Sequence, residues 1–459
     1  MLQQQWHLEA RSLELGGANV LAAWTTVRGS TAVIGIVDDG LQRTHPDLES
    51  NYRAALSRDF NNNDGDPTPE SIDAHGTATA GLAAARGDNG IGVSGVAPRA
   101  GLAGLRLLGA ATSDAQNAEA LGYLPNEIAI LSNSWGPSDD GRTMSGPGVL
   151  TRAAMDNAVR TGRDGKGRVY VWAAGNGGLG DDCNFDGYAN SRLVISVGAL
   201  ADSGRAASYS EPCSALTVMA SSSGGTRGLV TTDLAGSPGY SVSDYTTTFG
   251  GTSGAAPIAA GVVALMLDRN PALTWRDVKG ILRRTSIRVE PSESDWTSGP
   301  YPHHHRYGFG LVDAAAAVAA AATWTPLPAE QMLPAVTVPI NATIPDANAS
   351  GIQDTIAVSA PAGFIVEHVE VVLSVLHPYR GDLEVYLTSP SGVVSRIAAR
   401  RASDSNNNYS AWTFGSVRHW GESANGPWTL RIADREAADV GTWQSWTLRI
   451  YGRVGGAGQ

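Results

Sequence analysis

The chain has 459 residues, 42% of them hydrophobic, which excludes a wholly disordered polymer and allows two or three domains with a buried core. The formal charge of −11 disfavours nucleic acid as a partner and favours a cationic ligand. No apolar run approaches the roughly 20 residues that a membrane span needs. Only 17% of the residues are charged and 55 are glycine, which indicates a loop-rich, exported globular protein.

The first 325 residues alternate short apolar runs with helical stretches rich in small residues. The runs lie at 32–37, 128–131, 169–173 and 193–197. Continuous apolar strands with helices between them predict a parallel sheet covered on both faces. Helices are expected at 254–267, where an Asn-Pro pair follows, and at 313–322.

Residues 326–340 contain four prolines, which is typical of a linker. Beyond them the hydrophobic period changes to two, most clearly at 366–375 and 383–387, and the string WTLRI occurs twice. Alternating strands with aromatic residues and closely spaced turns predict an all-β sandwich over 341–459.

Three short motifs stand at boundaries between predicted strands and helices. Asp38 ends the first strand, His75 opens a helical run, and Ser253 opens the helix at 254–267. Functional groups in open α/β sheets gather at the carboxyl ends of strands and at the helix starts that face them. A serine hydroxyl needs an imidazole base, and the imidazole needs a carboxylate to orient it. We therefore predict Ser253 as nucleophile, His75 as general base and then acid, and Asp38 as the orienting carboxylate.

Each of these motifs alone is common in structural turns, so it is their joint occurrence in this order that indicates catalysis. The order Asp, His, Ser is that of subtilisin, whereas α/β-hydrolases run Ser, acid, His. Ala255 also breaks the Gly-x-Ser-x-Gly elbow, which disfavours an esterase of that fold.

A glycine-rich turn follows the apolar run at 169–173 and contains Asn176. By itself this is an ordinary turn, but beside a catalytic triad the amide of Asn176 is predicted to donate to an oxyanion. The backbone N–H of Ser253, at the start of its helix, is the expected second donor.

At this point the sequence resembles the kexin/furin-type proprotein convertases, a branch of the subtilisin-like serine proteases. The resemblance covers nearly the whole chain. The motifs of the first block are QQWHL, DDG, HPDL, HGT, SWGP, AAGNGG, DGY, YSEPC and GTSGAAP. Those of the second block are YRGDLEVYLTSPSG, WTF, HWGE and GPWTLRIAD. The resemblance implies a subtilisin-like α/β catalytic domain over 1–325 and a jelly-roll-like β-sandwich, the P domain, over 341–459.

The resemblance also implies cleavage after basic residues. By analogy with the family, Asp139 lies at the wall of the S1 pocket, Asp186 at its floor and Asp39 in the S2 pocket, while Asp73 assists His75. Carboxylates in a partly dehydrated pocket pair well with a guanidinium or ammonium group. Ordinary solvated acidic loops are the alternative. Where furin-type members carry acids that bind the P4 side chain, this chain has neutral residues, so a dibasic preference is expected instead. These neutral residues are Asn117 and Ser145.

Three groups of oxygen-bearing side chains resemble calcium sites of the family, and hard oxygen ligands on flexible loops suit Ca²⁺. Unbound acidic loops remain the alternative. The first group is Asp59, Asp64 and Asp66; the second is Asp47 and Asn89; the third is Asp139, Asp181 and Glu211.

The two cysteines, Cys183 and Cys213, permit one disulfide. They pair in the family pattern, which implies an oxidising compartment. There is no charged-then-apolar leader at Met1, so we expect any export signal or pro-segment to have been removed or to lie outside this sequence.

Three further sequence features have ordinary explanations. Three adjacent histidines, His303–His305, do not easily face one zinc ion, and a surface loop is expected there. The Arg380-Gly381-Asp382 tripeptide falls on the P-domain pattern and is not expected to bind integrins. Two internal dibasic pairs, at 283–284 and 400–401, are expected to be folded away from proteolysis.

The sequence as a whole predicts a secreted or periplasmic, calcium-dependent serine endopeptidase that cleaves after Arg or Lys, with an acyl-enzyme intermediate. Its partners are expected to be protein or peptide substrates with basic residues, together with a pro-segment or a chaperone. Two alternatives stay open: a subtilase of broad specificity, and a catalytically inert binding protein or adhesin that keeps the fold.

Overall fold

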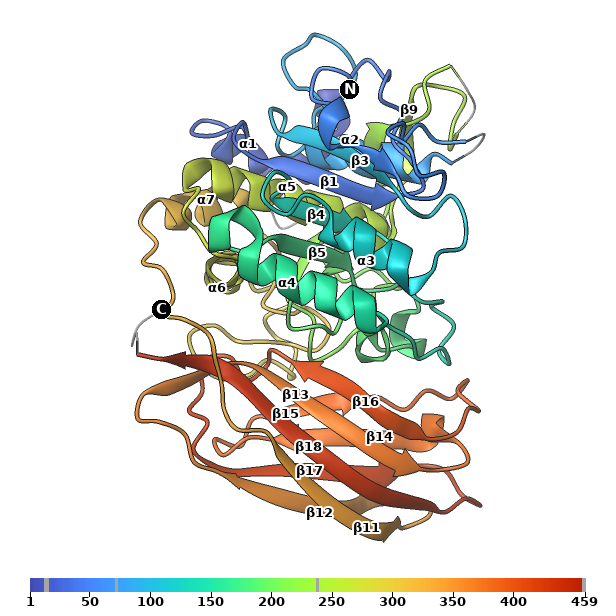
Figure 1. Cartoon of the computed structure of the whole chain (residues 1–459), viewed down its shortest axis with the longest axis vertical. Helices are drawn as coiled ribbons and strands as arrows, with labels where there is room; N and C mark the ends of the chain where they lie inside the picture. The colour runs from blue at the N-terminus through green and yellow to red at the C-terminus, as the bar shows by residue number, and fades with distance from the viewer. Residues whose placement is uncertain (12–15, 71–72, 237–238, 456–459) are drawn as a thin grey trace.

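The computed structural model describes residues 1–11, 16–70, 73–236 and 239–455. Two bodies stack along the long axis of the molecule, with the N-terminal α/β part above and a C-terminal antiparallel β-sandwich below (Figure 1). The predicted fold class is confirmed.

The α/β part is built on a seven-stranded parallel sheet with the order β2-β3-β1-β4-β5-β6-β7. Most of its strand residues are buried, because helices cover both faces. The strands are β1 (Val33–Asp38), β2 (Arg58–Asp59), β3 (Gly101–Arg106), β4 (Ile130–Asn133), β5 (Val169–Ala173), β6 (Val194–Leu200) and β7 (Val218–Ser221). A separate antiparallel pair, β8 (Leu229–Thr232) and β9 (Tyr245–Phe249), packs through β8 against α2 (His75–Ala84).

Alternate residues of each strand point to opposite helical layers. Val171 of β5 belongs to the apolar core that also contains α2 and α5 (Gly251–Arg269). Its neighbours Tyr170 and Trp172 belong to the core of the other face. That face is covered by α3 (Asp114–Gly122) and α4 (Val149–Gly165), which cross the front of the sheet in Figure 1. The remaining helices are α1 (Val20–Ala23), α6 (Trp275–Thr285) and α7 (Ala314–Ala322).

Helix α5 is the central helix of this part, and it begins three residues before the predicted 254–267. Pro257 is therefore the seventh helical residue and lies beyond the first turn. A proline has no N–H, so the carbonyl four residues earlier, that of Ser253, loses its helical partner. The hydroxyl of Ser134 donates to that carbonyl at 3.0 Å. Among the described helices, α5 alone has the length and apolarity of a membrane span, yet 83% of that window is buried in the core.

The C-terminal sandwich, here β10 to β18, consists of two antiparallel sheets. One has the order β10-β18-β13-β16 with β11 also paired to β18, and the other has the order β12-β17-β14-β15. The strands are β10 (Gln331–Met332), β11 (Val336–Ile344), β12 (Asn348–Val358), β13 (Phe364–Leu376), β14 (Leu383–Thr388), β15 (Val394–Ala398), β16 (Tyr409–Ser416), β17 (Gly426–Asp434) and β18 (Gly441–Val454).

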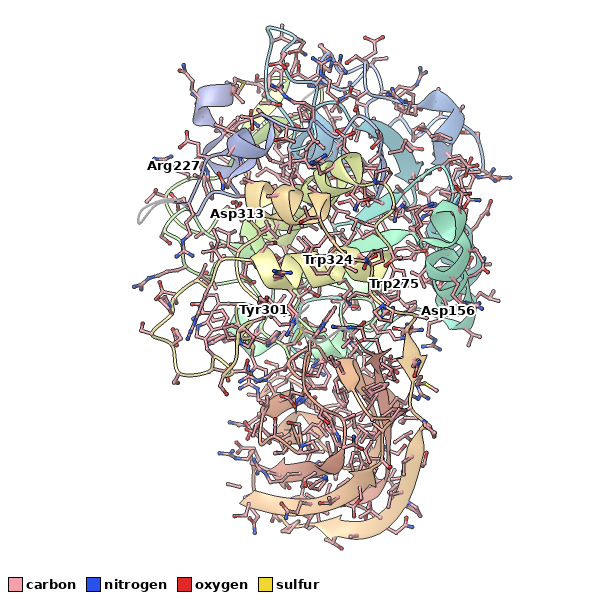
Figure 2. The ribbon with its side chains drawn as sticks, turned by 90° about the vertical axis from the view of Figure 1, so that its left-hand side faces the viewer. Asp156, Arg227, Trp275, Tyr301, Asp313 and Trp324 are labelled. Atoms are coloured by element: carbon pink, nitrogen blue, oxygen red, sulfur yellow. A yellow bond between two sulfur atoms is a disulfide. The ribbon has the colours of Figure 1, made fainter. Side chains whose placement is uncertain are left out.

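The stretch 326–340, predicted as a linker, contains β10 and the first half of β11, both paired with β18. Proline is tolerated there because β11 lies at the edge of its sheet, with one side free of ladder bonds. The chain before it is fastened to α6: Trp324, labelled in Figure 2, donates its indole N–H to Asp277 Oδ1 at 2.9 Å. The N–H of Leu327 donates to the same oxygen at 2.7 Å.

Candidate active site

An aspartate–histidine pair forms where β1 ends and α2 begins. Asp38 is the last residue of β1 and is 2% exposed, and His75 is the first residue of α2. His75 Nδ1 lies 2.8 Å from Asp38 Oδ1, and the hydroxyl of Thr79 donates to Asp38 Oδ2 at 3.3 Å. With Nδ1 held by the carboxylate, Nε2 is the ring nitrogen that can exchange a proton with a reacting group.

A second carboxylate, Asp39, lies beside this pair and holds the start of α2. Its two oxygens accept the backbone N–H groups of His75, at 3.1 Å, and of Gly76, at 2.7 Å. Burial and the neighbouring charge of Asp38 raise the pKa of Asp39 to about 7. Burial alone would lower the pKa of His75, but the charge and hydrogen bond of Asp38 and the charge of Asp39 raise it to about 9.

Ser253 lies in the first turn of α5 and faces the residue after β4. Its hydroxyl donates to the carbonyl of Ser134 at 3.3 Å. Phe249, four residues earlier, contacts the ring of His75, with centroids 5.5 Å apart. Within the described ranges no hydrogen bond joins Ser253 to His75, so the hydroxyl must turn from Ser134 toward the imidazole. Such bonds are often long in unliganded enzymes and tighten when substrate binds.

Asn176 lies close to the same turn of α5, in the loop after β5. Its Oδ1 accepts the N–H of Thr252 at 2.8 Å and the hydroxyl of Thr252 at 3.0 Å. These bonds fix the orientation of the amide, and Nδ2 donates to Asp139 Oδ2 at 3.3 Å. Gly251 allows this contact, because its φ of +72° favours glycine and a Cβ there would lie 3.3 Å from Asn176 Oδ1.

A pocket of about 220 Å³ adjoins Ser253 and Asn176. Two carboxylates, Asp139 and Asp186, line it, and none of its described lining residues is basic. Asp186 Oδ1 accepts the N–H of Tyr188 at 2.7 Å. Burial raises the pKa of Asp186 to about 7, with smaller contributions from the charges of Asp139 and Asp181. A cation entering the pocket would favour the ionised form of Asp186.

Asp73, predicted to assist His75, instead faces Arg106 at 3.9 Å. The buried guanidinium of Arg106 also lies 2.8 Å from Asp59 and 3.3 Å from Glu70, and it donates to the carbonyl of Asp39 at 3.0 Å. The structure thus places Asp73 in an ionic group with Arg106, Asp59 and Glu70, and its assistance to His75 stays a prediction.

With the triad residues, Asn176 and an acidic pocket in place, comparison with known proteins identifies the family. Residues 29–310 match the profile of the Subtilase family, and residues 366–450 match the Proprotein convertase P-domain. The chain belongs to the subtilase family. It is 39% identical over 475 residues to mouse Proprotein convertase subtilisin/kexin type 4, covering 98% of this chain and 70% of that protein.

Other relatives are much longer than this subtilase. Human Proprotein convertase subtilisin/kexin type 6 is 41% identical over 456 residues, which cover 95% of this chain, but the chain spans 46% of that protein. Among solved structures, the Aeromonas sobria serine protease in complex with the chaperone ORF2 superposes with a TM-score of 0.89. That match is 26% identical and covers 99% of this chain and 95% of the other.

The three predicted calcium groups of this subtilase differ in how their carboxylates are paired. In the first, Asp59 pairs with Arg106 and Asp66 pairs with Arg43, so guanidinium groups already balance two of the charges. In the second, the oxygens of Asp47 accept Asn89 Nδ2 at 2.7 Å and the N–H of Val93 at 2.8 Å. These carboxylates thus have protein partners in the structure, and calcium at the first two groups stays a prediction.

The third group, Asp139, Asp181 and Glu211, retains excess negative charge. Asp181 pairs with Arg401 at 3.2 Å, and Glu211 accepts the N–H of Gly177 at 2.9 Å. Burial, followed by the charges of Asp181 and Asp139, raises the pKa of Glu211 well above its usual range. One guanidinium for three carboxylates leaves a charge that suits a divalent ion with oxygen ligands. In the described part of the chain, however, no three such side chains have the spacing of a formed metal site.

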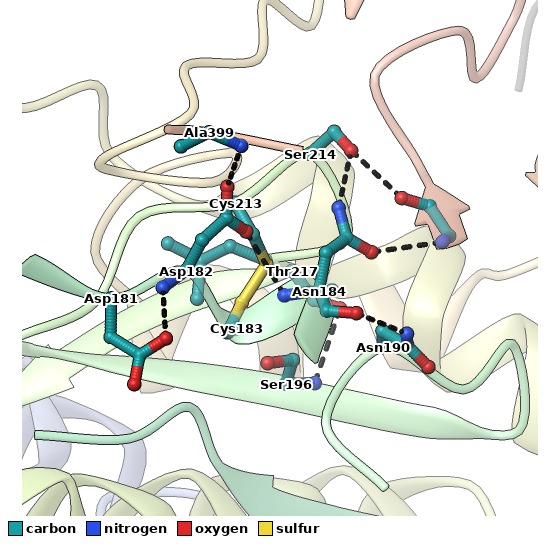
Figure 3. Close-up of a disulfide and its surroundings, with 12 residues drawn as sticks. Asp181, Asp182, Cys183, Asn184, Asn190, Ser196, Cys213, Ser214, Thr217 and Ala399 are labelled. Atoms are coloured by element: carbon teal, nitrogen blue, oxygen red, sulfur yellow. Dashed lines mark hydrogen bonds between the residues drawn. A yellow bond between two sulfur atoms is a disulfide. The ribbon is translucent and has the colours of Figure 1, made fainter. Parts of the chain in front are cut away.

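The disulfide is present: Cys183 and Cys213 are bonded, with Cα atoms 5.4 Å apart (Figure 3). The expected surface loop at His303–His305 is wrong, because all three rings are buried where the α/β part meets the sandwich. His303 Nε2 contacts the carbonyl of Leu216 at 2.8 Å, and His305 Nδ1 contacts Asp295 at 2.7 Å. His303 and His305 therefore turn to different partners rather than to one ion.

The expectation that the internal dibasic pairs are folded away is met only in part, because one arginine of each pair is buried and the other is exposed. Arg283 lies inside α6 and is 7% exposed, and Arg401 is 1% exposed. Their neighbours Arg284 and Arg400 are exposed.

Sequence reasoning missed the residues that position the predicted catalytic groups. Thr252 orients Asn176, Thr79 holds Asp38, and Ser134 receives the Ser253 hydroxyl. The only signal in the sequence that could have pointed to these three residues was their position within or next to the motifs GTSGAAP, HGT and SWGP.

Proposed function

We propose that this subtilase is a secreted serine endopeptidase that cleaves peptide bonds after Arg or Lys, with a preference for paired basic residues. The observation that carries the proposal is the acidic pocket lined by Asp139 and Asp186 beside Ser253. The α/β part over 1–325 carries the catalysis, and the C-terminal sandwich supports it. The disulfide supports action in an oxidising compartment.

The chemistry follows from the roles of the side chains. Ser253 Oγ attacks the carbonyl carbon after the basic residue while its proton passes to His75 Nε2, and Asp38 stabilises the imidazolium. Asn176 Nδ2 and the N–H of Ser253 donate to the oxyanion. The C–N bond then breaks as His75 returns the proton to the departing amine, leaving an acyl-enzyme. Water, deprotonated by His75, releases the acid and restores the Ser253 hydroxyl.

Substrate selection rests on charge. Asp186 at the end of the pocket and Asp139 at its wall pair with the P1 cation, and Asp39 is placed beside the catalytic pair for a P2 cation. The first test is to compare hydrolysis of a peptide ending in Lys-Arg with one ending in Ala-Ala-Pro-Phe. We expect the basic peptide to be cleaved far faster. Equal rates would indicate a broad-specificity subtilase, and equal inertness of wild type and Ser253→Ala would indicate a binding protein.

The pKa of His75 predicts an alkaline pH profile. The general base must be neutral, so kcat/KM should rise with pH and level off only above about 9. Asp39→Asn removes a negative charge that favours the imidazolium, so it should move this rise to lower pH. The measurement is the pH dependence of Ser253 sulfonylation by methanesulfonyl fluoride, which needs no P2 residue. Asp164→Asn, an exposed change at the end of α4, should leave the profile in place.

Calcium is proposed at the third group, where Asp139, Asp181 and Glu211 would hold it. There it would supply charge compensation and order the loops that carry the pocket carboxylates. A pro-segment or a chaperone is the proposed folding partner, which the Aeromonas complex supports by analogy.

Chelation should therefore lower the melting temperature. An ion that binds only the folded state at 100 times its Kd adds about 2.7 kcal/mol of stability. For a chain of 459 residues that corresponds to a loss of roughly 3 °C in EGTA. Glu211→Gln should reduce this loss, and Asp64→Asn, in the first group, should not. An unchanged wild-type melting curve in EGTA would contradict the calcium proposal.

A further inference from the structure

Two arginines of the C-terminal sandwich reach across the boundary to the loop that follows Asp139. Arg380 Nη2 donates to the carbonyl of Arg142 at 2.7 Å. Arg401 Nη1 donates to the carbonyl of Thr143 at 2.8 Å. These contacts join residues 238 and 258 positions apart in the chain. The loop 139–145 thus receives donors from the sandwich at two successive carbonyls.

One buried carboxylate, that of Asp404, binds the guanidinium groups of both arginines. Asp404 Oδ2 accepts Arg380 Nε at 2.8 Å and also pairs with Arg401. The guanidinium of Arg401 lies over the ring of Phe185, 3.5 Å from its centroid, and reaches Asp181 at 3.2 Å. Arg401 is 1% exposed and Asp404 3% exposed, so this group is a packed part of the domain boundary.

The segment that carries Asp186 is held from the sandwich as well. Trp412 Nε1 donates to the carbonyl of Asn184 at 2.9 Å, and the N–H of Gly415 donates to Asn184 Oδ1 at 2.8 Å. The N–H of Ala399 donates to Asp182 Oδ2 at 3.1 Å, as Figure 3 shows next to the disulfide. Two residues that shortly precede Asp186 are therefore bonded to β16 and to the residue after β15.

The two held segments meet at the pocket. Ser145 and Asp186 form an isolated parallel bridge, and the N–H of Gly187 donates to the carbonyl of Ser145 at 2.9 Å. The loop that begins at Asp139 therefore ends against the segment of Asp186. A displacement of either segment would move one of the two pocket carboxylates relative to the other.

We propose that Arg380 and Arg401 are positioning residues of the pocket, through which the C-terminal sandwich sets the affinity for the P1 side chain. They do not touch substrate; they fix the backbone that carries Asp139 and, through Phe185, the backbone next to Asp186. The inference rests on the proposed function, since it assigns those two carboxylates to P1 binding. Arg380, the first residue of the Arg380-Gly381-Asp382 tripeptide, thereby has an intramolecular role in positioning the pocket.

The test compares Arg401→Met and Arg380→Met with Arg400→Met in the full chain. Arg400 is the exposed neighbour of Arg401 and pairs with Glu436 within the sandwich, so it is a matched control. We expect the KM for a P1-Arg peptide, and the Ki of benzamidine as a small pocket ligand, to rise about tenfold in the first two variants. Sulfonylation of Ser253 by methanesulfonyl fluoride should stay within twofold of wild type, because the triad lies outside the held loops.

Lower stability alone would not produce this pattern, since Ki and KM are properties of the folded fraction. Arg401→Lys and Arg380→Lys, which keep the charge but not the forked geometry, serve if the methionine variants do not fold, and we expect a smaller rise in Ki. Unchanged Ki and KM in these variants, with only a lower melting temperature, would overturn the inference. If the wild type neither cleaves P1-Arg peptides nor binds benzamidine, it is the proposed function that fails.

Discussion

Ser253→Ala is expected to reduce kcat on a basic peptide by about a millionfold, the loss found for the nucleophile of subtilisin. The acyl bond forms on Ser253 Oγ, and no other atom of this side chain can replace it. The oxyanion donors, Asn176 Nδ2 and the N–H of residue 253, remain in the variant. His75→Ala should lose about as much, because the two residues act as a unit and their losses are not additive. The measurement is single-turnover hydrolysis of a P1-Arg peptide.

The control for this pair is Ser134→Ala. In the structure the Ser253 hydroxyl donates to the Ser134 carbonyl, while the Ser134 hydroxyl holds the carbonyl that Pro257 leaves without a helical partner. Removing the Ser134 hydroxyl should cost stability but leave Ser253 able to turn to His75. A Ser253→Ala variant that kept wild-type activity would exclude the triad.

Much of the site could be predicted from the sequence because its residues lie at ends of elements. Asp38 ends an apolar strand and His75 and Ser253 open helices, so a parallel sheet brings them to one edge. The predicted run 169–173 is β5 with the same bounds, and Asn176 follows it. Local sequence patterns were sufficient to place these residues, because the end of an apolar run and the start of a helical run can both be recognised in the sequence.

The pairing of the acidic residues could not be predicted in the same way. Asp181 and Arg401 are 220 residues apart, and Asp59 and Arg106 are 47 apart, and no local pattern announces either contact. A cluster of carboxylates in sequence is compatible with a bound ion or with buried arginines, and only the fold decides between them. For the same reason the pairing of β10 and β11 was missed, since their partner, β18, lies about 100 residues later and is the last of the described strands.

Asp186→Asn is expected to reduce kcat/KM for a P1-Arg peptide by about a thousandfold. The change keeps the size of the side chain and removes its charge, so a bound guanidinium would lose its partner inside the pocket. Breaking a buried pair in this way costs about 3–5 kcal/mol. Peptides with an apolar P1 residue should lose far less, and sulfonylation of Ser253 should not change.

The pH dependence separates this role from a structural one. Because the pKa of Asp186 is raised to about 7, the carboxylate ionises as pH increases through 7, and P1-Arg binding should improve over that interval. Asp186→Asn has no group to ionise there, so the rise in kcat/KM near pH 7 should vanish while the rise toward pH 9 from His75 remains. Asp164→Asn, exposed and distant from the pocket, should keep both. Full activity of Asp186→Asn on P1-Arg peptides would exclude Asp186 from P1 binding and leave Asp139 as the remaining acid among the described residues that line the pocket.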